Sequence, residues 1–308
     1  SVIDKCNLRC TYCMPADGLP WLPQQELMSA DEIRRIVRVA VRSLGAEELR
    51  MTGGEPLVRK DLEHIIAGIR ADHPDLPISL TTNAVGLDRR AASLKEAGLT
   101  RLNVSLDTLH PETFAALTRR PFLDRVLAGL QAARAVGLGP IKINAVLLRG
   151  VNDTEVVPLV EWAVSSGFEM RFIEDMPLDG DRSWTAMQVV PARDIRAAIA
   201  EAFTLTPDPR GRGAAPAERF EVRRPGDTAL AGHVGIISSV TEPFCAACSR
   251  TRVTADGRIR SCLFSHEETD LLAPLRDGAD DEQLAQVWRD AMWAKPRAHG
   301  SDTVGLAR

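Results

Sequence analysis

Three cysteines near the start of the chain are spaced so that their thiols could bind one metal centre. Cys6, Cys10 and Cys13 lie within eight residues in the pattern C-x3-C-x2-C. Thiolates are soft ligands that favour zinc, Cu(I) or iron–sulfur clusters, and a structural zinc ion nearly always has four protein ligands. Only three are local here, because the next Cys or His is His64. Three thiolates on a four-iron cluster would leave one iron open to a substrate group, so the spacing favours a cluster over zinc.

A second group of three cysteines lies near the other end of the chain. Cys245, Cys248 and Cys262 form the pattern C-x2-C-x13-C, and no other cysteine is left over. The C-x2-C pair alone also fits a zinc ribbon, and His266 could complete a Cys3His zinc site. Secreted disulfide scaffolds are small and rich in cysteine, unlike this chain. Two metal sites in a reducing cytosol therefore fit better than three disulfides.

Two arginines directly follow the C-x2-C pair. Arg250 and Arg252 alternate along a predicted strand, so their side chains would point to one face. Guanidinium groups bind phosphate oxygens with two parallel hydrogen bonds. A solvated charged strand is the plainer interpretation of this pair, but beside an open iron it predicts a clamp for an anionic substrate.

The overall composition is that of a soluble globular protein. The chain has 308 residues, of which 44% are hydrophobic and 26% charged. No apolar run approaches membrane-spanning length and no signal peptide precedes Cys6, so we expect a cytoplasmic protein with no membrane partner. The net charge of −4 argues against a general nucleic-acid binder, although a local arginine cluster could still bind a small anion.

Strands and helices alternate along the first part of the chain. Ser29 to Glu32 form a capping-box pattern, apolar residues at helical spacing follow to Leu44, and Gly45 supplies a stop signal. Further strands are predicted over 49–52, 77–82, 101–106, 141–148 and 169–174, with helices near 62–69, 89–97, 111–117, 123–136 and from 152. The alternation predicts parallel strands with right-handed crossovers. Five or six units do not complete an eight-unit barrel, so an open barrel and a doubly wound sheet remain.

The pattern changes near residue 183. A helix is predicted over 191–203, followed by a segment rich in Pro, Gly and Arg over 207–216, which we expect to be a mobile loop or a linker. Short strands over 220–223 and 234–238 and a last amphipathic helix near 284–292 follow. We therefore predict two domains, residues 1–182 and residues 183–308.

Four residues of recurring local motifs lie at or just after the carboxyl ends of predicted strands. They are Gly53, Thr81, Ser105 and Met176. Binding sites of α/β folds gather at this edge of a sheet. The placement therefore predicts one shared pocket.

The first cysteine group resembles the signature of the radical S-adenosylmethionine (SAM) enzymes. In that superfamily three cysteines hold a [4Fe-4S] cluster whose open iron chelates SAM, and the aromatic residue before the third cysteine, here Tyr12, packs near the cluster and the adenine. The resemblance implies an α/β fold: an incomplete (β/α)6 TIM-like barrel of the radical SAM type, with a smaller C-terminal α+β domain that carries a second iron–sulfur cluster.

A wider set of motifs resembles the GTP 3′,8-cyclase family within this superfamily. The matching segments, besides the cysteines and the Arg250/Arg252 pair, are 50–57, 80–83, 102–107, 142–144, 171–176 and 244–263. The family converts GTP to 3′,8-cyclo-7,8-dihydro-GTP through a 5′-deoxyadenosyl radical, in the first step of molybdenum cofactor biosynthesis. The resemblance implies the same activity here.

The resemblance also implies a role for each matching residue. The SAM cluster would be held by Cys6, Cys10 and Cys13, and a second [4Fe-4S] cluster, whose open iron meets the guanine base, by Cys245, Cys248 and Cys262. The SAM site would be lined by Tyr12, Gly54, Ser105 and Met176. GTP would contact Arg50, Thr81, Lys142, Arg250, Thr251 and Arg252, with the cations chiefly on its triphosphate. Taken alone, each could be an ordinary turn, strand-end or ion-pair residue.

The resemblance further implies protein partners. These are an electron donor and a downstream cyclic pyranopterin monophosphate synthase, and the chain could also form a homodimer. Two departures from the family concern the ends. The chain begins five residues before Cys6, without an arginine from the family's first strand, and it ends at Arg308 without the family's Gly-Gly tail. We expect either a trimmed version of a longer protein or a different tail.

Two other functions fit parts of the sequence. Another radical SAM enzyme with an auxiliary cluster, such as a peptide-modifying maturase, would usually carry more C-terminal cysteines and would not need the Arg250/Arg252 pair. A non-enzymatic module with two structural zinc ions would be colourless, whereas iron–sulfur proteins are brown.

Overall fold

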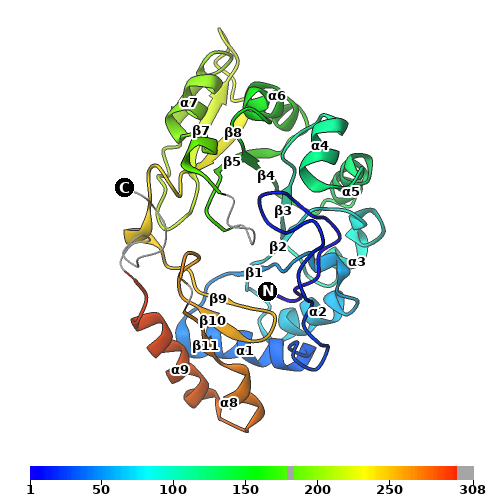
Figure 1. Cartoon of the computed structure of the whole chain (residues 1–308), viewed down its shortest axis with the longest axis vertical. Coiled ribbons are helices and arrows are strands. Elements are labelled where there is room, and N and C mark those ends of the chain that lie inside the picture. Colours follow the sequence, from blue (N-terminus) through cyan, green and yellow to red (C-terminus); the bar gives the residue numbers. More distant parts are fainter. Residues whose placement is uncertain (179–183, 266, 297–308) are drawn as a thin grey trace.

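The computed structural model of the chain describes residues 1–178, 184–265 and 267–296. One sheet of eight strands has the order β1-β2-β3-β4-β5-β8-β7-β6. Its first six members in space run parallel, and the last two pair antiparallel. The sheet curves as an open barrel with helices on its outer side (Figure 1). This confirms the incomplete barrel and sets aside the doubly wound sheet.

The elements have the following bounds. The strands of the large sheet are β1 (Leu49–Met51), β2 (Ile78–Thr82), β3 (Arg101–Ser105), β4 (Ile141–Leu147), β5 (Glu169–Glu174), β6 (Thr204–Pro207), β7 (Glu218–Arg223) and β8 (Gly232–Ile237). The helices are α1 (Ala30–Leu44), α2 (Leu62–Asp72), α3 (Ala91–Glu96), α4 (Pro111–Thr118), α5 (Leu123–Ala135), α6 (Val156–Ser165), α7 (Ala192–Ala200), α8 (Leu272–Arg276) and α9 (Asp281–Trp293). A small antiparallel sheet contains β9 (Arg252–Val253), β10 (Arg258–Arg260) and β11 (Thr269–Asp270).

The first helix follows its sequence signals closely. The Ser29 hydroxyl accepts a hydrogen bond from the Glu32 amide while the Glu32 carboxylate accepts one from the Ser29 amide, which confirms the capping box. Gly45 ends the helix in the left-handed conformation with φ of 69°. The helix predicted over 89–97 is shorter: a 3-10 turn, η2 (Leu87–Arg89), precedes α3.

The sixth parallel strand comes from the second half of the chain. β8 pairs parallel with β5, with Met170 opposite Val234, so the sheet is continuous across the change of pattern near residue 183. The segment expected to be a loop or linker, 207–216, begins at the last residue of β6, and residues 208–217 connect the antiparallel strands β6 and β7. They are anchored by the buried carboxylate of Asp208, which accepts hydrogen bonds from Arg210 and Arg219.

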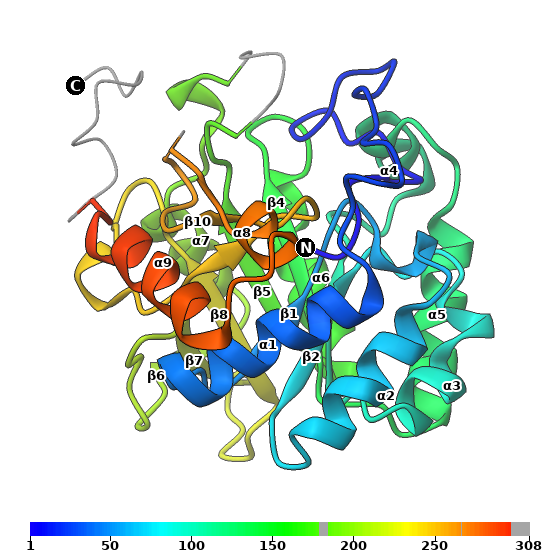
Figure 2. The same ribbon diagram turned by 90° about the horizontal axis from the view of Figure 1, so that it is seen from below.

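The last helix, α9, packs against the first helix, α1. Arg35 donates to the Asp281 carboxylate at 2.9 Å and Arg38 donates to it at 3.3 Å, which joins α1 to the start of α9. The terminal amine of Ser1 donates to the Val253 carbonyl in the small sheet. Figure 2 shows α1 and α9 side by side. The two ends of the described chain therefore lie on the same side of the open barrel.

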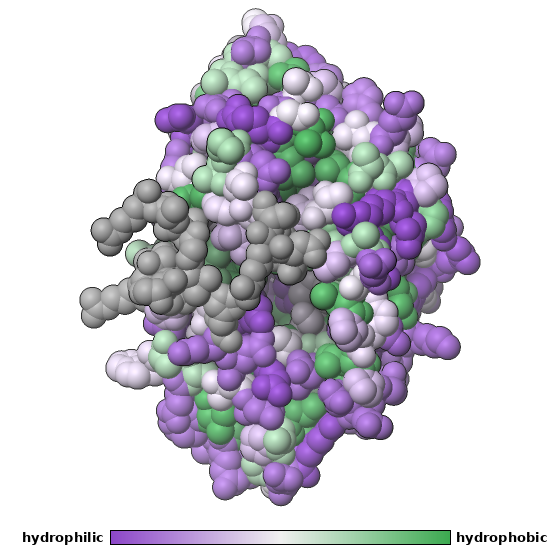
Figure 3. Space-filling view, viewed as in Figure 1, coloured by the Kyte–Doolittle hydropathy of each residue, from purple (hydrophilic) through white to green (hydrophobic). Residues whose placement is uncertain are grey.

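The core lies between the sheet and its outer helices. Leu62, Ile65, Ile66 and Ile69 of α2 are fully buried at helical spacing, and burial of each such side chain stabilises the fold by about 1.5–3 kcal/mol. On the face seen in Figure 3, hydrophilic residues predominate and apolar residues form small separate groups. No helix of the described residues is long and apolar enough to span a membrane.

Candidate active site

The inner face of the barrel is polar. Along β4 the residues Ile141, Ile143, Ala145 and Leu147 are buried, whereas the alternating residues Lys142 and Asn144 are only half-buried. Because successive side chains of a strand point to opposite faces, the apolar ones face the outer helices and the polar ones face the inside of the barrel. In register, Lys142 lies beside Asn103 of β3, and Asn144 lies beside Ser105. The predicted pocket therefore has a hydrophilic wall.

The cysteine loop is held by the end of α4. The Arg9 amide donates to the Thr118 carbonyl at 3.0 Å and the Thr11 amide to the Leu117 carbonyl at 2.9 Å. Arg119, at the C-terminal cap of α4, donates to the Arg9 carbonyl at 3.0 Å. These contacts fix the backbone on both sides of Cys10.

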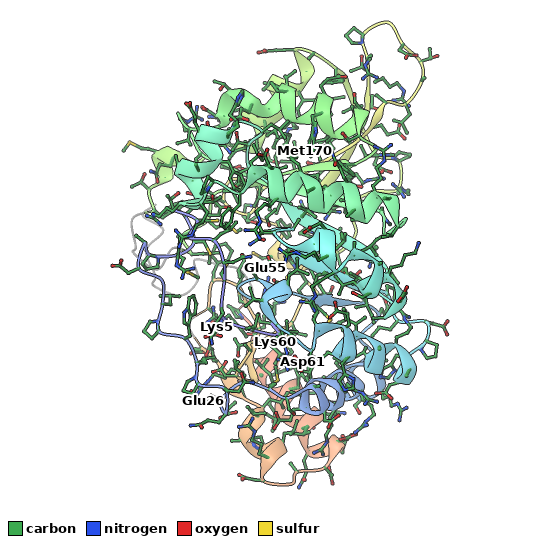
Figure 4. All side chains as sticks on the ribbon, turned by 90° about the vertical axis from the view of Figure 1, so that its right-hand side faces the viewer. Lys5, Glu26, Glu55, Lys60, Asp61 and Met170 are labelled. Atoms are coloured by element: carbon green, nitrogen blue, oxygen red, sulfur yellow. The ribbon has the colours of Figure 1, made fainter. Side chains whose placement is uncertain are left out.

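The buried carboxylate of Glu55 links this loop to β1 and β2. It accepts hydrogen bonds from the Asn83 amide and the Thr82 hydroxyl, both at 2.7 Å, and burial raises its pKa. The Asn83 side chain in turn donates to Asn7 at 2.7 Å. Figure 4 shows Glu55 near the middle of the molecule and close to Lys5, whose carbonyl accepts from the Glu55 amide. The Glu55 side chain thus has a structural role that the sequence did not indicate.

Gly53 and Gly54 allow the segment before Cys6 to pass close to the end of β1. A Cβ at position 53 would lie 2.4 Å from the Ile3 carbonyl oxygen, and one at position 54 would lie 2.3 Å from the Asp4 carbonyl oxygen. Both clashes are with backbone atoms, which cannot rotate away as a side chain can. The resemblance implies that Gly54 lines the SAM site, and the structure gives a further reason for both glycines within the chain itself.

Gly54→Ala is expected to destabilise the fold by about 1–3 kcal/mol, because overpacking against fixed backbone costs about that much. It should also displace Cys6. Gly68→Ala is a matched control in α2, since its Cβ would meet only the flexible Arg34 side chain and alanine favours a helix. Thermal unfolding and iron content measure both effects. Equal unfolding temperatures for the two variants would contradict the prediction.

The first cysteine group is suited to hold a cluster, because its surroundings disfavour thiolates that have no metal bound. All six cysteines of the chain are free. Burial raises the pKa of Cys6, Cys10 and Cys13, and the Asp107 carboxylate raises that of Cys10 further. A cationic iron centre would offset both effects, because bound metal ions deprotonate their thiol ligands. The thiols at this site therefore fit a metal centre.

Within the described residues, no three Cys, His, Asp or Glu side chains lie close enough to hold a single metal ion. A tetrahedral zinc ion would need its sulfur ligands at about 2.3 Å. A four-iron cluster is larger and binds each thiolate through a different iron, so it accepts a wider spacing. His266, the suggested fourth ligand of a C-terminal zinc site, lies outside the described residues.

The expected SAM residues surround the same edge of the sheet. Tyr12, in the cysteine loop, donates its hydroxyl to Asp107 just beyond β3 at 2.7 Å. Ser105 is the last residue of β3, Gly54 follows β1, and Met176 follows β5. The strands bring these four residues to one end of the barrel, and their contacts with SAM remain a prediction.

The second cysteine group has the opposite electrostatic surroundings. Cys245 begins the 3-10 turn η5 (Cys245–Ala247), and the Cys248 amide donates to its carbonyl at 3.1 Å. Burial alone would raise the pKa of Cys248, but hydrogen bonds and charge from Arg250, with the charge of Lys295, lower it to about 7. Lys295 donates to the Cys248 sulfur at 3.4 Å and to the Arg250 carbonyl at 3.1 Å. Sequence analysis missed Lys295.

A group of cations lies inside the barrel. Desolvation lowers the pKa of Arg50, and the charges of Arg171 and Arg250 lower it further. The pKa of Lys142 is lowered by burial and by Arg171. Arg50 and Lys142 therefore lie within electrostatic range of the other cations. No sequence motif gave Arg171 a role. It lies two residues after Glu169 on β5 and therefore shares the inner face of the strand with it.

Two carboxylates lie near these cations. The charge of Glu48 partly offsets the lowering of the Arg50 pKa, and Glu169 contacts the other cations directly. Glu169 accepts from Arg171 at 2.8 Å and from Arg219 at 3.0 Å, and Lys142 lies 3.7 Å from it. Thr81 is half-buried on β2 and is paired in register with Asn103. Glu169 holds Arg171, Arg219 and Lys142 in place, and the inner face of the barrel still carries an excess of positive charge.

Arg250 connects the barrel cations to the second cysteine group. Its Nε is buried and has no hydrogen-bond partner within the described residues. Its charge also lowers the pKa of Arg252, after the effect of burial. Thr251 accepts a hydrogen bond from the Trp288 indole at 2.9 Å, which leaves its own proton available to a ligand. A buried guanidinium nitrogen without a hydrogen-bond partner is typical of a site that binds an anion.

Arg212 is a further cation that the sequence did not indicate. It comes from the connection between β6 and β7 and lies 4.0 Å from the centre of the Phe244 ring, while Arg250 lies 5.1 Å from the same ring. Cations over an aromatic ring are stabilised by its quadrupole. Phe244, directly before Cys245, thus contacts both arginines.

Comparison with known proteins identifies the class. Residues 1–163 match the radical SAM superfamily, and residues 168–301 match the family described as molybdenum cofactor synthesis C. The chain is 63% identical to GTP 3′,8-cyclase of Paenarthrobacter nicotinovorans, over 99% of this chain and 88% of that relative. It is 52% identical to GTP 3′,8-cyclase of Streptomyces coelicolor, over 98% of this chain and 87% of the relative. The chain is therefore a radical SAM protein. Within that superfamily it belongs to the GTP 3′,8-cyclase family.

A solved structure has the same fold. Streptococcus suis SuiB bound to S-adenosylmethionine matches with a TM-score of 0.64 over 93% of this chain and 63% of that chain, at 16% identity. At this identity the likeness concerns the fold alone. It agrees with the open barrel described above.

Proposed function

We propose that this protein converts GTP to 3′,8-cyclo-7,8-dihydro-GTP, the first step of molybdenum cofactor biosynthesis. The observation that carries the proposal is the group of cations that extends from the inner face of the barrel to the second cysteine triad, in a chain of net charge −4. The group consists of Arg50, Lys142, Arg171, Arg250 and Arg252. A triphosphate is the kind of ligand that such a group would bind. The named activity of the close relatives supports the same substrate.

The residues that hold the cofactors follow from the two triads. As a radical SAM protein of this family, the chain uses SAM and [4Fe-4S] clusters, with Cys6, Cys10 and Cys13 proposed for the first cluster. Cys245, Cys248 and Cys262 are proposed for the second. When bound, the first cluster would supply the one-electron chemistry that turns SAM into a source of a radical able to remove the C3′ hydrogen of the ribose.

The chain itself supplies orientation and shielding. Tyr12, Gly54, Ser105 and Met176 are proposed to position SAM at the carboxyl end of the barrel strands. Arg50, Thr81, Lys142, Arg250, Thr251 and Arg252 are proposed to hold GTP. Fixing the triphosphate at one end of the cavity places the ribose against SAM, and the C-terminal residues exclude water from the reacting atoms.

The two cofactor sites are proposed to lie in different predicted domains. Residues 1–182 would carry SAM chemistry, and residues 183–308 would carry the second cluster and part of the GTP site. The proposal includes a one-electron donor and a downstream cyclic pyranopterin monophosphate synthase as partners, in the cytoplasm. A homodimer stays a prediction.

Isotope transfer tests the proposed function directly. Reconstituted protein would be incubated without oxygen with SAM, a reductant and GTP carrying deuterium at C3′ of the ribose. We expect deuterium in the 5′-deoxyadenosine and a product isomeric with GTP, both measured by mass spectrometry. GTP deuterated only at C2′ is the control. SAM cleavage that leaves GTP intact and transfers no deuterium would reject the proposal.

Glu169→Gln is expected to tighten GTP binding by about tenfold, because removal of a unit charge near the triphosphate relieves repulsion of that order at an effective dielectric constant of about 20. Product formation should fall at the same time, since Arg171 and Arg219 lose a common anchor. Calorimetric titration measures the affinity for GTP. Asp208→Asn is the control, because Asp208 also pairs with Arg219 but, among the described residues, forms no ion pair with Lys142 or Arg171. Weaker GTP binding by the Glu169 variant alone would contradict the prediction.

A further inference from the structure

A buried carboxylate, Asp107, lies directly against the cysteine loop. It is 6% exposed and belongs to none of the groups assigned to SAM or GTP. One carboxylate oxygen accepts from the Tyr12 hydroxyl at 2.7 Å, and the other accepts from the Val146 amide of β4 at 2.9 Å. Tyr12 lies between Cys10 and Cys13. Asp107 therefore joins the middle of the cysteine loop to the sheet.

Asp107 is itself held rigidly. The buried Asn152 side chain donates to the Asp107 carbonyl and to the Val146 carbonyl, both at 2.9 Å. Its oxygen accepts from the Leu148 amide at 2.8 Å. The backbone around Asp107 is thus fixed to the end of β4 by a fully satisfied network.

This carboxylate is costly to bury. Burial raises the pKa of Asp107 to about 6, opposed only by the hydrogen bonds from Tyr12 and Val146. A buried charge is usually paired with a cation, and no cation of the described residues counters the burial of this one. An apolar residue of similar size would cost the fold less. What the carboxylate supplies instead is an acceptor for both the Tyr12 hydroxyl and the Val146 amide.

We propose that Asp107 is a positioning residue for the first iron–sulfur cluster, which acts through the Tyr12 hydroxyl to fix the loop between Cys10 and Cys13. The backbone contacts with α4 fix the loop at Arg9 and Thr11. They do not reach Cys13, which is exposed. Directly after Cys13, Arg119 donates to the Met14 carbonyl at 3.1 Å. The Tyr12 hydroxyl is the side-chain contact that joins this last part of the loop to the sheet, through Asp107. The proposal rests on the cysteine loop holding the cluster and not on GTP as the substrate.

The two partners should behave as one unit. Asp107→Ala removes the acceptor and Tyr12→Phe removes the donor, so each alone should weaken retention of the first cluster. Loss of a residue that orients a metal ligand typically costs about 10- to 100-fold in metal affinity. The double variant should be no worse than either single variant, because coupled residues are not additive. Asp107→Asn should restore much of the loss, since its amide oxygen can accept from Val146 while its amide nitrogen donates to Tyr12.

Tyr12 is the one tyrosine of the chain, which makes the contact observable without cofactor or substrate. Protein labelled with carbon-13 at the tyrosine ζ position gives a single NMR resonance. We expect this resonance to shift in cluster-free Asp107→Ala protein and to remain in place in Glu155→Ala protein. Glu155 is the matched control, because it is an equally buried carboxylate that bonds to Thr108 but makes no hydrogen bond to the cysteine loop.

Iron retention and the SAM-induced change in the EPR spectrum then test the effect on the cluster. We expect Asp107→Ala and Tyr12→Phe to lose iron from the first cluster and to blunt the response to SAM, while Glu155→Ala lowers the unfolding temperature alone. An unshifted tyrosine resonance in Asp107→Ala would overturn the proposal. So would equal iron loss in the Asp107 and Glu155 variants. Neither readout depends on GTP, so a failure of the proposed GTP conversion can be distinguished from a failure of the proposal for Asp107.

Discussion

Cys10→Ser is expected to abolish SAM cleavage and, with it, any conversion of GTP. Serine offers a hard oxygen with a high pKa, whereas iron–sulfur clusters require soft thiolates. Cys10 also lies at the centre of the loop, where its carbonyl accepts from the amides of Cys13 and Met14 at 3.0 and 2.9 Å. The backbone contacts do not involve the sulfur, so the variant should fold. Chromatography of 5′-deoxyadenosine measures the loss, which should reach background.

Cys248→Ser is the matched variant in the second triad. It should leave SAM cleavage partly intact, because the first triad is unchanged, while the GTP product is lost. Iron analysis supports the comparison: about eight irons per chain should fall to about four when Cys245, Cys248 and Cys262 are all replaced by serine. Full GTP turnover by the Cys248 variant would contradict the two-cluster arrangement.

Local signals in the sequence predicted the local parts of the fold. The α1 helix was defined by Ser29, Glu32 and Gly45, because capping and the left-handed stop involve residues within one turn of each other. The strands β1 to β5 were found from their apolar runs and regular spacing. The family followed from the two cysteine triads and the motifs between them, since a cluster requires particular residues at particular spacing.

Contacts between distant segments could not be predicted in this way. β8 joins β5 as a sixth parallel strand, although the change of composition near residue 183 suggested the start of a separate unit. Arg212 lies in a segment rich in Pro and Gly that has no periodic pattern, yet the β6–β7 connection brings it to Phe244. Such placements depend on sheet order, which local sequence patterns do not encode.

The motif around Gly54 shows a third kind of limit. The resemblance implied that SAM meets the backbone there, where glycine allows a close approach because it lacks a Cβ. It did not indicate that the approaching backbone includes Asp4 and Lys5 of the chain itself. Likewise Glu55 was noted for its place in the motif, but its bonds to Thr82 and Asn83 depend on the pairing of β1 with β2.

Arg250→Ala is expected to weaken GTP binding by about 10- to 100-fold, which corresponds to the roughly 1.5–3 kcal/mol of hydrogen bonds to charged groups. Arg250 has the buried, unpaired Nε and lies between the barrel cations and Cys248. Its removal therefore takes away both a phosphate ligand and part of the charge that lowers the pKa of Cys248. Arg250→Lys should recover only part of the loss, because an ammonium keeps the charge but not the planar fork.

Arg258→Ala provides the control for this variant. Arg258 is an exposed arginine on β10 of the same small sheet, paired with Asp256 at 3.0 Å. Calorimetric titrations with GTP and with GMP separate the two parts of the site. Arg250→Ala should reduce the GTP affinity much more than the GMP affinity if Arg250 binds the outer phosphates, whereas Arg258→Ala should change neither. Equal losses for both nucleotides would instead place Arg250 at the base or the ribose, and the triphosphate would then depend on Arg50, Lys142 and Arg171.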